Sequence, residues 1–131
     1  EAPQRIAILG SMNELGEISQ VEHEKLGKMF SPDVVDWVIT VGDEAEKYLA
    51  PAAHAQGCQV KSFKNAVQAG AFAHGVMQRN ALVLVKGSQN QVYTEEAIKI
   101  LLLDQTIVNK LVRQSSAWMA TKEEFFERNL V

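Results

Sequence analysis

The sequence predicts an α/β domain with a three-layer, Rossmann-like and mostly parallel sheet that carries helices on both faces. Short apolar runs alternate with helix-like stretches along residues 5–103, a pattern typical of βαβ units with right-handed crossovers. The run 81–85 contains only Ala, Leu and Val, as in a strand buried on both faces. From residue 104 onward the patterns are helical only. We therefore expect a 1–103 α/β domain and a 104–131 helical extension packed on or beside it, with Trp118 packed against the sheet or a neighbouring helix rather than docking a partner.

Each expected element has a local signal. The run at 59–63 is short and polar, which suits a strand at the edge of the sheet. Ser19 with Glu22, and Thr121 with Glu124, have the spacing of capping boxes that open helices, and Gly57 suits the C-terminal end of one. The expected strands are 5–9, 36–41, 59–63 and 81–85, and the expected helices are 19–30, 44–56, 66–79 and 94–103, with a further apolar stripe at 107–112 and a last helix from 121.

Composition and charge exclude several classes of function. The chain has 131 residues and a formal net charge of −3, which argues against binding to nucleic acid. No apolar run approaches the roughly 20 residues that a membrane helix needs. Cys58 is the only cysteine, so no internal disulfide forms, and we expect it to be a small packed residue of a cytoplasmic protein. A core strand that begins at Arg5 without a preceding Met suggests a segment of something longer.

Glycine-bearing loops follow three of the expected strands, at Gly10, Gly42 and Gly87. In an open parallel sheet, ligands bind beyond the carboxyl ends of the strands, where the strand order reverses. We therefore expect the segments 10–16 and 86–91 to form the walls of a site.

These loops do not carry a complete nucleotide, metal or nucleophile motif. Gly16 lies one residue too far from Gly10 for a P-loop and no Lys follows it, and the dinucleotide fingerprint is absent. His23-Glu24 begins a zinc-like motif, but Gly27 stands where the second His would be. No nucleophile elbow is present. We expect the three histidines to face solvent or to cap helices.

The segment Lys86-Gly87-Ser88 is the strongest candidate for ligand binding. Lys86 ends a strand that is expected to be buried, where its ammonium needs water or an anion. Gly87 permits close approach of a ligand to the backbone, and Ser88 adds a hydroxyl. A carboxylate or a phosphate would suit these groups. The alternative, equally compatible with the spacing, is that Lys86 pairs with Glu14 or Asp43.

Two segments together resemble a known family. RIAILGSMNELGEISQVEHEKLG (Arg5–Gly27) and LVLVKGSQNQVYTEEAIKIL (Leu82–Leu101) are similar to the C-terminal domain of Mur ligases, most of all to the type that adds D-alanyl-D-alanine to a UDP-muramoyl tripeptide. The resemblance covers residues 5–103. The matching positions are Gly10, Met12, Glu14, Leu15, Gly16, His23, Gly42, Lys86, Gly87 and Ser88.

The resemblance implies the third domain of a three-domain bacterial enzyme of peptidoglycan precursor synthesis. In such ligases, ATP phosphorylates a carboxylate of the UDP-muramoyl-peptide, and the amine of an incoming amino acid or dipeptide attacks the acyl phosphate. ATP and Mg²⁺ are held mainly by the central domain, and the UDP group by the N-terminal domain. The C-terminal domain closes over both, which excludes water from the intermediate. The partners implied are therefore those two domains and the two substrates; this chain alone should bind no cofactor and be catalytically inert.

The resemblance assigns roles to residues in the two loops. Two positions depart from the family pattern: Ser11 stands where Asp is common, and Gln89 where Arg is usual, which leaves the identity of the added residue open. The alternative to a ligase domain is a free-standing, non-catalytic α/β binding or regulatory module. A P-loop found upstream in the same reading frame would decide in favour of the ligase. The expected substrate-binding residues are Ser11, Asn13, Glu14, Lys86, Gly87, Ser88 and Gln89, and the expected loop-shaping residues are Gly10, Met12, Leu15, Gly16 and Gly42.

Overall fold

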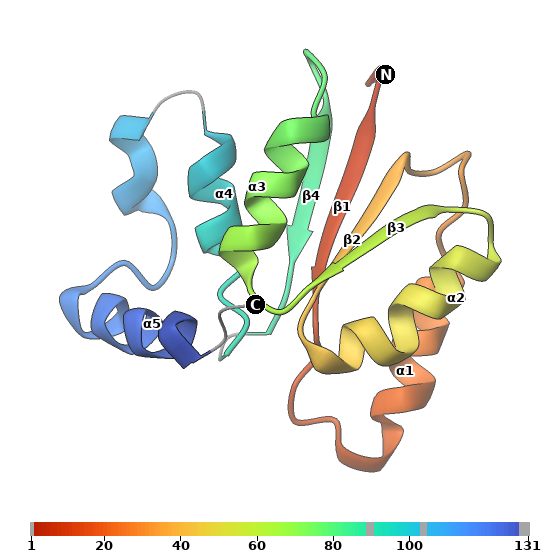
Figure 1. Cartoon of the computed structure of the whole chain (residues 1–131), viewed down its shortest axis with the longest axis horizontal. Helices are drawn as coiled ribbons and strands as arrows, with labels where there is room; N and C mark the ends of the chain where they lie inside the picture. Colours follow the sequence, from red (N-terminus) through yellow and green to blue (C-terminus); the bar gives the residue numbers. More distant parts are fainter. Residues whose placement is uncertain (1, 89–90, 103–104, 129–131) are drawn as a thin grey trace.

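Four parallel strands form a single sheet in the computed structural model, which describes residues 2–88, 91–102 and 105–128 (Figure 1). The strand order is β3-β2-β1-β4, and all three neighbouring pairs are parallel. This confirms the predicted α/β class and the edge position of the third strand. The strands are β1 (Arg5–Gly10), β2 (Trp37–Val41), β3 (Gln59–Phe63) and β4 (Leu82–Lys86).

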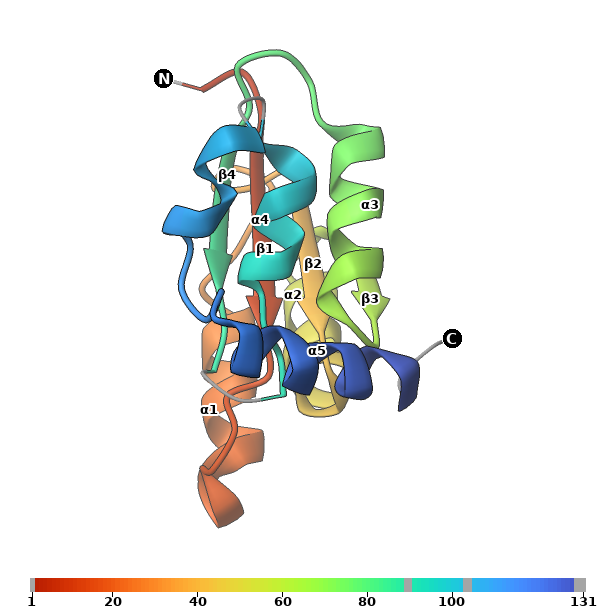
Figure 2. The same ribbon diagram turned by 90° about the vertical axis from the view of Figure 1, so that its left-hand side faces the viewer.

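Helices cover both faces of the sheet. Figures 1 and 2 show α1 and α2 on one face and α3 and α4 on the other. The expected helix 44–56 is a π-helical segment, η2, continued by α2. The last helix begins at Ser116 rather than Thr121. The elements are η1 (Gly16–Ile18), α1 (Ser19–Gly27), η2 (Ala45–Leu49), α2 (Ala50–Ala55), α3 (Ala66–Val76), α4 (Glu95–Leu101), η3 (Gln105–Lys110) and α5 (Ser116–Arg128).

Alternate residues of β1 fill two separate cores, because successive side chains of a strand point to opposite faces. Ile6 and Ile8 pack toward α3 and α4, whereas Ala7 and Leu9 pack toward α1 and α2. Each of these side chains is at most 2% exposed. Cys58 is buried in the second core, as expected of a small packed residue, and burial raises the pKa of its thiol.

The prediction that 81–85 is buried on both faces is wrong. β4 is an outer strand of the described sheet, and Leu82 and Leu84 are 60% and 53% exposed. Val83 and Val85 pack inward on the α3 and α4 side. An unbroken apolar run does not reveal how far helices extend over a sheet, and α1 and α2 pack against the residues of β1, β2 and β3.

Both predicted capping boxes are also wrong. The Ser19 hydroxyl contacts His23 instead of capping α1, and Thr121 lies inside α5 and donates to the Ala117 carbonyl. Gly57 does follow the end of α2 with φ +93°, as predicted. In both cases the hydroxyl is bonded to a group four residues away in the same helix instead of to a free amide at the helix end.

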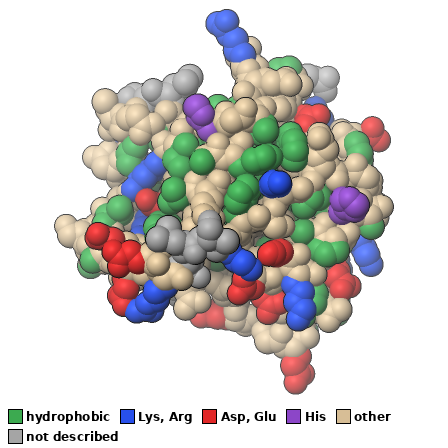
Figure 3. Space-filling view, viewed as in Figure 1, with side chains coloured by type: hydrophobic (Ala, Val, Ile, Leu, Met, Phe, Trp, Pro, Cys, Tyr) green, Lys and Arg blue, Asp and Glu red, His purple; other side chains and the backbone are tan. Residues whose placement is uncertain are grey.

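The C-terminal extension packs on the α/β unit through its aromatic side chains. Trp118 packs against Tyr93, with 6.1 Å between ring centroids, as expected of a packed rather than a docking residue. None of the helices in the described ranges has the length and apolar character needed to cross a membrane. On the face that Figure 3 shows, acidic and basic side chains are interspersed.

Candidate functional site

The two loops that the sequence singles out meet at the carboxyl edge of the sheet. β1 connects to β2 on one side, whereas β4 lies on the other side of β1, so the strand order reverses between β1 and β4. The Asn13 N–H donates a 2.7 Å hydrogen bond to the Ser88 hydroxyl oxygen across this gap. Residues separated by 75 positions in the sequence thus form one continuous wall at the position where open α/β sheets bind ligands.

Gly10 is required by the close approach of these loops. A Cβ atom at this position would lie 2.2 Å from Cγ1 of Val92 and 3.2 Å from the Cα of Gly87. The chain after β4 therefore crosses directly over the end of β1. Any side chain at Gly10 would push the two loops apart.

Ser11 fixes the start of the next loop. Its side chain is nearly buried, at 4% exposure, and its hydroxyl oxygen accepts from the Ala45 N–H at 3.0 Å. The same hydroxyl donates to the Val41 carbonyl at 3.4 Å. Gly42 has φ +100°, and a Cβ there would meet the Ser11 oxygen at 2.6 Å. An ionised Asp at position 11 would have no proton for the Val41 carbonyl, which accounts physically for a neutral residue here.

His23 is a buried anchor of the first loop, and the prediction that it faces solvent or caps a helix is wrong. Its side chain has no exposed surface. Nε2 accepts from the Met12 N–H at 2.9 Å, and Nδ1 donates to the Ser19 carbonyl at 2.8 Å. These two bonds fix the neutral tautomer with the proton on Nδ1. The signals in the sequence are the spacing of four from Ser19, which places both residues on one helix face, and the match of His23 to the family pattern.

Several non-glycine residues in the two loops have left-handed backbone. Glu14 has φ 67° in the first loop, and Gln91 and Tyr93 have φ 65° and 52° in the segment after β4. Such conformations cost on the order of 1–3 kcal/mol each in a residue with a side chain and are concentrated at functional sites. The Glu14 side chain is exposed.

The predicted site residues line two adjacent hollows rather than one. Glu14 lines neither, and Gln89 lies outside the described residues. The first hollow, of about 160 Å³, is lined by Leu9, Gly10, Met12, Leu26, Lys86, Gly87 and Ser88. The second, of about 310 Å³, is lined by Ser11, Asn13, Gly42, Asp43, Glu44, Lys64, Gln91, Val92 and Phe125.

Lys86 is exposed because β4 is an outer strand, so the expected cost of burying its ammonium does not arise. The alternative pairing with Asp43 or Glu14 is also not observed. Asp43 pairs with Lys64 at 2.9 Å, and Lys86 makes no ion pair within the described ranges. Lys86 thus lines the smaller hollow as an exposed lysine that is not used in an ion pair within these ranges.

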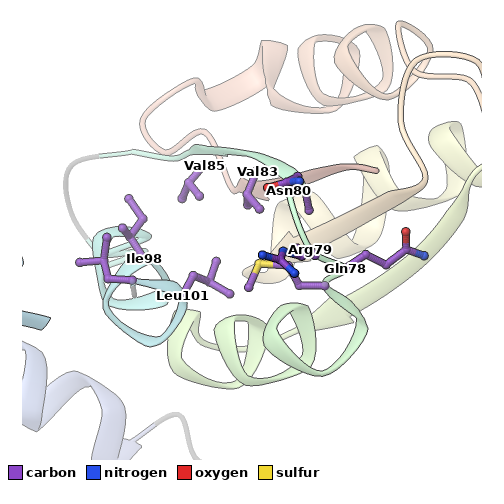
Figure 4. A pocket seen from close by; sticks show the side chains of 10 residues that line it. Gln78, Arg79, Asn80, Val83, Val85, Ile98 and Leu101 are labelled. Atoms are coloured by element: carbon purple, nitrogen blue, oxygen red, sulfur yellow. The ribbon is translucent and has the colours of Figure 1, made fainter. Parts of the chain in front are cut away.

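Sequence reasoning missed two features around these loops. Phe125, from the C-terminal extension, lines the second hollow. A larger apolar hollow of about 920 Å³ lies at the opposite edge of the sheet, between the segment Met77–Ala81, β4 and α4 (Figure 4). Its lining is mainly apolar, with Gln78, Arg79 and Asn80 as its polar residues, and it shares no lining residue with the two hollows of the paired loops.

The fold is that of an open parallel α/β domain, and the paired loops meet at the carboxyl edge, where sheets of this kind bind ligands. The family model described as Mur ligase, glutamate ligase domain, matches residues 1–89. The chain therefore belongs to the Mur ligase family. A comparison with curated protein sequences gives no match.

Solved structures of MurF share the fold. A MurF crystal structure from Acinetobacter baumannii has a TM-score of 0.61 at 20% identity, over 75% of this chain and 22% of that one. MurF ligase from Thermotoga maritima in complex with ADP has a TM-score of 0.57 at 20% identity, over 82% of this chain and 23% of that one. The present chain thus spans between a fifth and a quarter of the length of these ligases.

Proposed function

We propose that this chain is the closing, substrate-binding C-terminal domain of an ATP-dependent ligase of peptidoglycan precursor synthesis. The ligase would join an amino acid or D-alanyl-D-alanine to a UDP-N-acetylmuramoyl-peptide by forming an amide bond. The observation that carries this proposal, beside the family match, is the hydrogen-bonded pair of loops where the strand order reverses. The proposed partners are the N-terminal and central domains of the same ligase, in the cytoplasm.

Nucleotide and metal chemistry is assigned to the central domain. The described residues contain no group of three or more His, Cys, Asp or Glu side chains that could hold a metal ion. The chain also lacks a P-loop. The residues present therefore do not fit ATP with Mg²⁺ as a self-sufficient site, and we assign this domain no step on the phosphates.

The charges around the two hollows suit the two ends of an incoming amino acid or dipeptide. Lys86 presents an ammonium to the smaller hollow, and Ser88, which accepts from Asn13, keeps its hydroxyl proton for a ligand. These groups suit a carboxylate. Asp43 and Glu44 line the larger hollow, but Asp43 is paired with Lys64, which lines the same hollow, so Glu44 is the proposed partner of an ammonium group. The domain would bind and orient this substrate and, on closing, exclude water from the acyl phosphate.

The test uses the full-length ligase that contains this domain. Phosphate release is measured with the UDP-muramoyl-peptide and ATP, with and without D-alanyl-D-alanine. Dependence on the dipeptide supports the proposal, and release that is indifferent to every amino acid and dipeptide contradicts it. Lys86→Ala and Ser88→Ala should lower kcat/KM for the dipeptide by about 10- to 100-fold, because a hydrogen bond to a charged group contributes roughly 1.5–3 kcal/mol. Lys61→Ala, an exposed lysine on the opposite edge strand, is the matched control. Wild-type turnover in both site variants would remove these residues from the site.

A further inference from the structure

The last helix lies against the carboxyl edge of the sheet. Figures 1 and 2 show α5 beside the ends of the strands, running across their direction. Its Phe125 lines the 310 Å³ hollow opposite residues from the loops after β1 and β2, among them Asn13, Asp43 and Glu44. One wall of the candidate substrate site is therefore supplied by the C-terminal extension.

A buried lysine holds α5 in this position. Lys122 is 1% exposed, and its Nζ lies 2.7 Å from Oε2 of Glu96 and 3.1 Å from Oε1 of Glu95, both at the start of α4. Nζ also donates to the Arg113 carbonyl at 2.7 Å. These three contacts favour the observed position of the helix, because a shift of α5 would leave buried charges without partners.

Arg113, which precedes α5, makes a second connection to the start of α4. Its guanidinium donates two hydrogen bonds to the Glu95 carboxylate, at 2.7 and 2.9 Å. Burial raises the pKa of Glu95, but the hydrogen bonds from Arg113 and Lys122 outweigh it and leave that pKa below the ordinary value. Burial likewise opposes ionisation of Glu96, and hydrogen bonds from Lys122 and Lys99 bring its pKa below the ordinary value. Both carboxylates are thus ionised partners at neutral pH.

Aromatic contacts join α5 to the site loop itself. The Tyr93 ring, which is 3% exposed, lies 5.5 Å from Phe125, 6.3 Å from Phe126 and 6.1 Å from Trp118. Tyr93 belongs to the segment after β4 that packs over Gly10, and its backbone has φ 52°. The position of Phe125 is therefore coupled to the loop that forms the ligand-binding edge.

We propose that α5 is a fixed wall of the substrate site and that Phe125 is a residue that determines its specificity. This inference rests on the proposed function. The hollow is lined by the carboxylate of Glu44, by the ion pair of Asp43 with Lys64, and by the apolar groups of Val92 and Phe125. An amino acid or dipeptide with its ammonium toward Glu44 places its side chain against the Phe125 ring. The size of that ring limits which side chains fit.

The experiment compares Phe125→Ala with Phe126→Ala in the full-length ligase. Both rings contact Tyr93 and both are half-buried on α5, but only Phe125 lines the hollow. A panel of D-amino acids and dipeptides with small to bulky side chains is measured for kcat/KM and, by calorimetry, for affinity. Phe125→Ala should shift the preference from small toward bulky side chains by about tenfold or more, whereas Phe126→Ala should leave it unchanged. Phe125→Leu keeps an apolar wall, so its preference for bulky over small side chains should lie between those of Phe125→Ala and Phe126→Ala.

Each outcome is decisive for the inference. Equal preferences in Phe125→Ala and Phe126→Ala would overturn it, since a general loosening of α5 affects both variants. If the ligase releases no phosphate with any amine, the proposed function fails, and the calorimetric panel still tests the wall. In that case a Phe125-dependent affinity for an ammonium-bearing ligand supports the inference, and the absence of binding by the whole panel overturns it.

Discussion

The attachment of α5 gives the sharpest prediction, through the replacement of Lys122 by Met. Methionine keeps the length and the apolar stem of lysine but removes the ammonium that contacts Glu95, Glu96 and the Arg113 carbonyl. The two carboxylates stay at the start of α4 with fewer donors. We expect α5 to detach more readily while the sheet keeps its structure.

The size of the effect follows from the partners that remain. Removing one member of a buried ion pair costs about 3–5 kcal/mol when the other is left alone, and an exposed pair contributes about 0–1 kcal/mol. In the variant, Glu95 keeps both bonds from Arg113, and Glu96 keeps Lys99 at 2.9 Å and Gln114 at 3.1 Å. The cost therefore falls between those limits, at about 2–3 kcal/mol, which corresponds to a roughly 30- to 150-fold increase in the opening of α5.

Hydrogen exchange measures this opening directly, because it reports the free energy of local as well as global unfolding. In Lys122→Met, the protection of amides in α5 should fall by roughly 30- to 150-fold, and the protection of amides in β1 and β2 should change less. Arg128→Met is the matched control, since Arg128 pairs with Glu124 on the exposed side of the same helix and should change protection little. A loss of less than about threefold at Lys122→Met, or an equal loss in the control, would refute the role of Lys122.

Three further changes test the site and its supports. Gly10→Ala should destabilise the protein by about 1–3 kcal/mol in urea unfolding, because its Cβ would overlap Val92, and Val92→Ala in the same chain should restore part of the loss; full additivity of the two changes would contradict the overlap. His23→Phe should lower the free energy of unfolding by about 1–3 kcal/mol, because the Met12 N–H then has no acceptor. His23→Gln keeps an acceptor and should lower it less, and equal losses in the two variants would contradict an acceptor role for His23. The pKa values of Glu95 and Glu96 are lowered in the folded protein, so their contribution to stability is complete above their ordinary pKa of 4.5 and is lost as the pH falls below it. Exchange protection of α5 should therefore fall on acidification through that range, and protection that is constant down to pH 3 would contradict this.

The strands and the class of fold could be predicted because their causes are local. Alternation of apolar runs with helical patterns identifies parallel βαβ units, and the polar run at 59–63 correctly indicates an edge strand. The burial of 81–85 could not be predicted, because it depends on which helices cover β4. The capping boxes failed for a different reason: the hydroxyls of Ser19 and Thr121 are bonded within their own helices, a competing local interaction that the spacing does not distinguish from a cap.

The site could be predicted in part. The glycines after the strands indicate the two loops, and the Asn13–Ser88 hydrogen bond shows that these loops meet; that they bind a substrate stays a prediction. The roles of His23 and Ser11 could not be predicted, since each depends on backbone groups brought close by folding. Their own local sequence shows only a helix histidine and a loop serine.

The C-terminal extension links these observations. Its sequence shows an apolar stripe and aromatic residues, which are compatible with any buried helix. Only the fold places Phe125 at the hollow and Lys122 at the start of α4. A helix that served only to cover apolar surface would not need a buried ammonium, since an apolar residue of similar volume stabilises as well or better. The cluster instead fixes one position of the helix, which is what a substrate wall requires and what general packing does not.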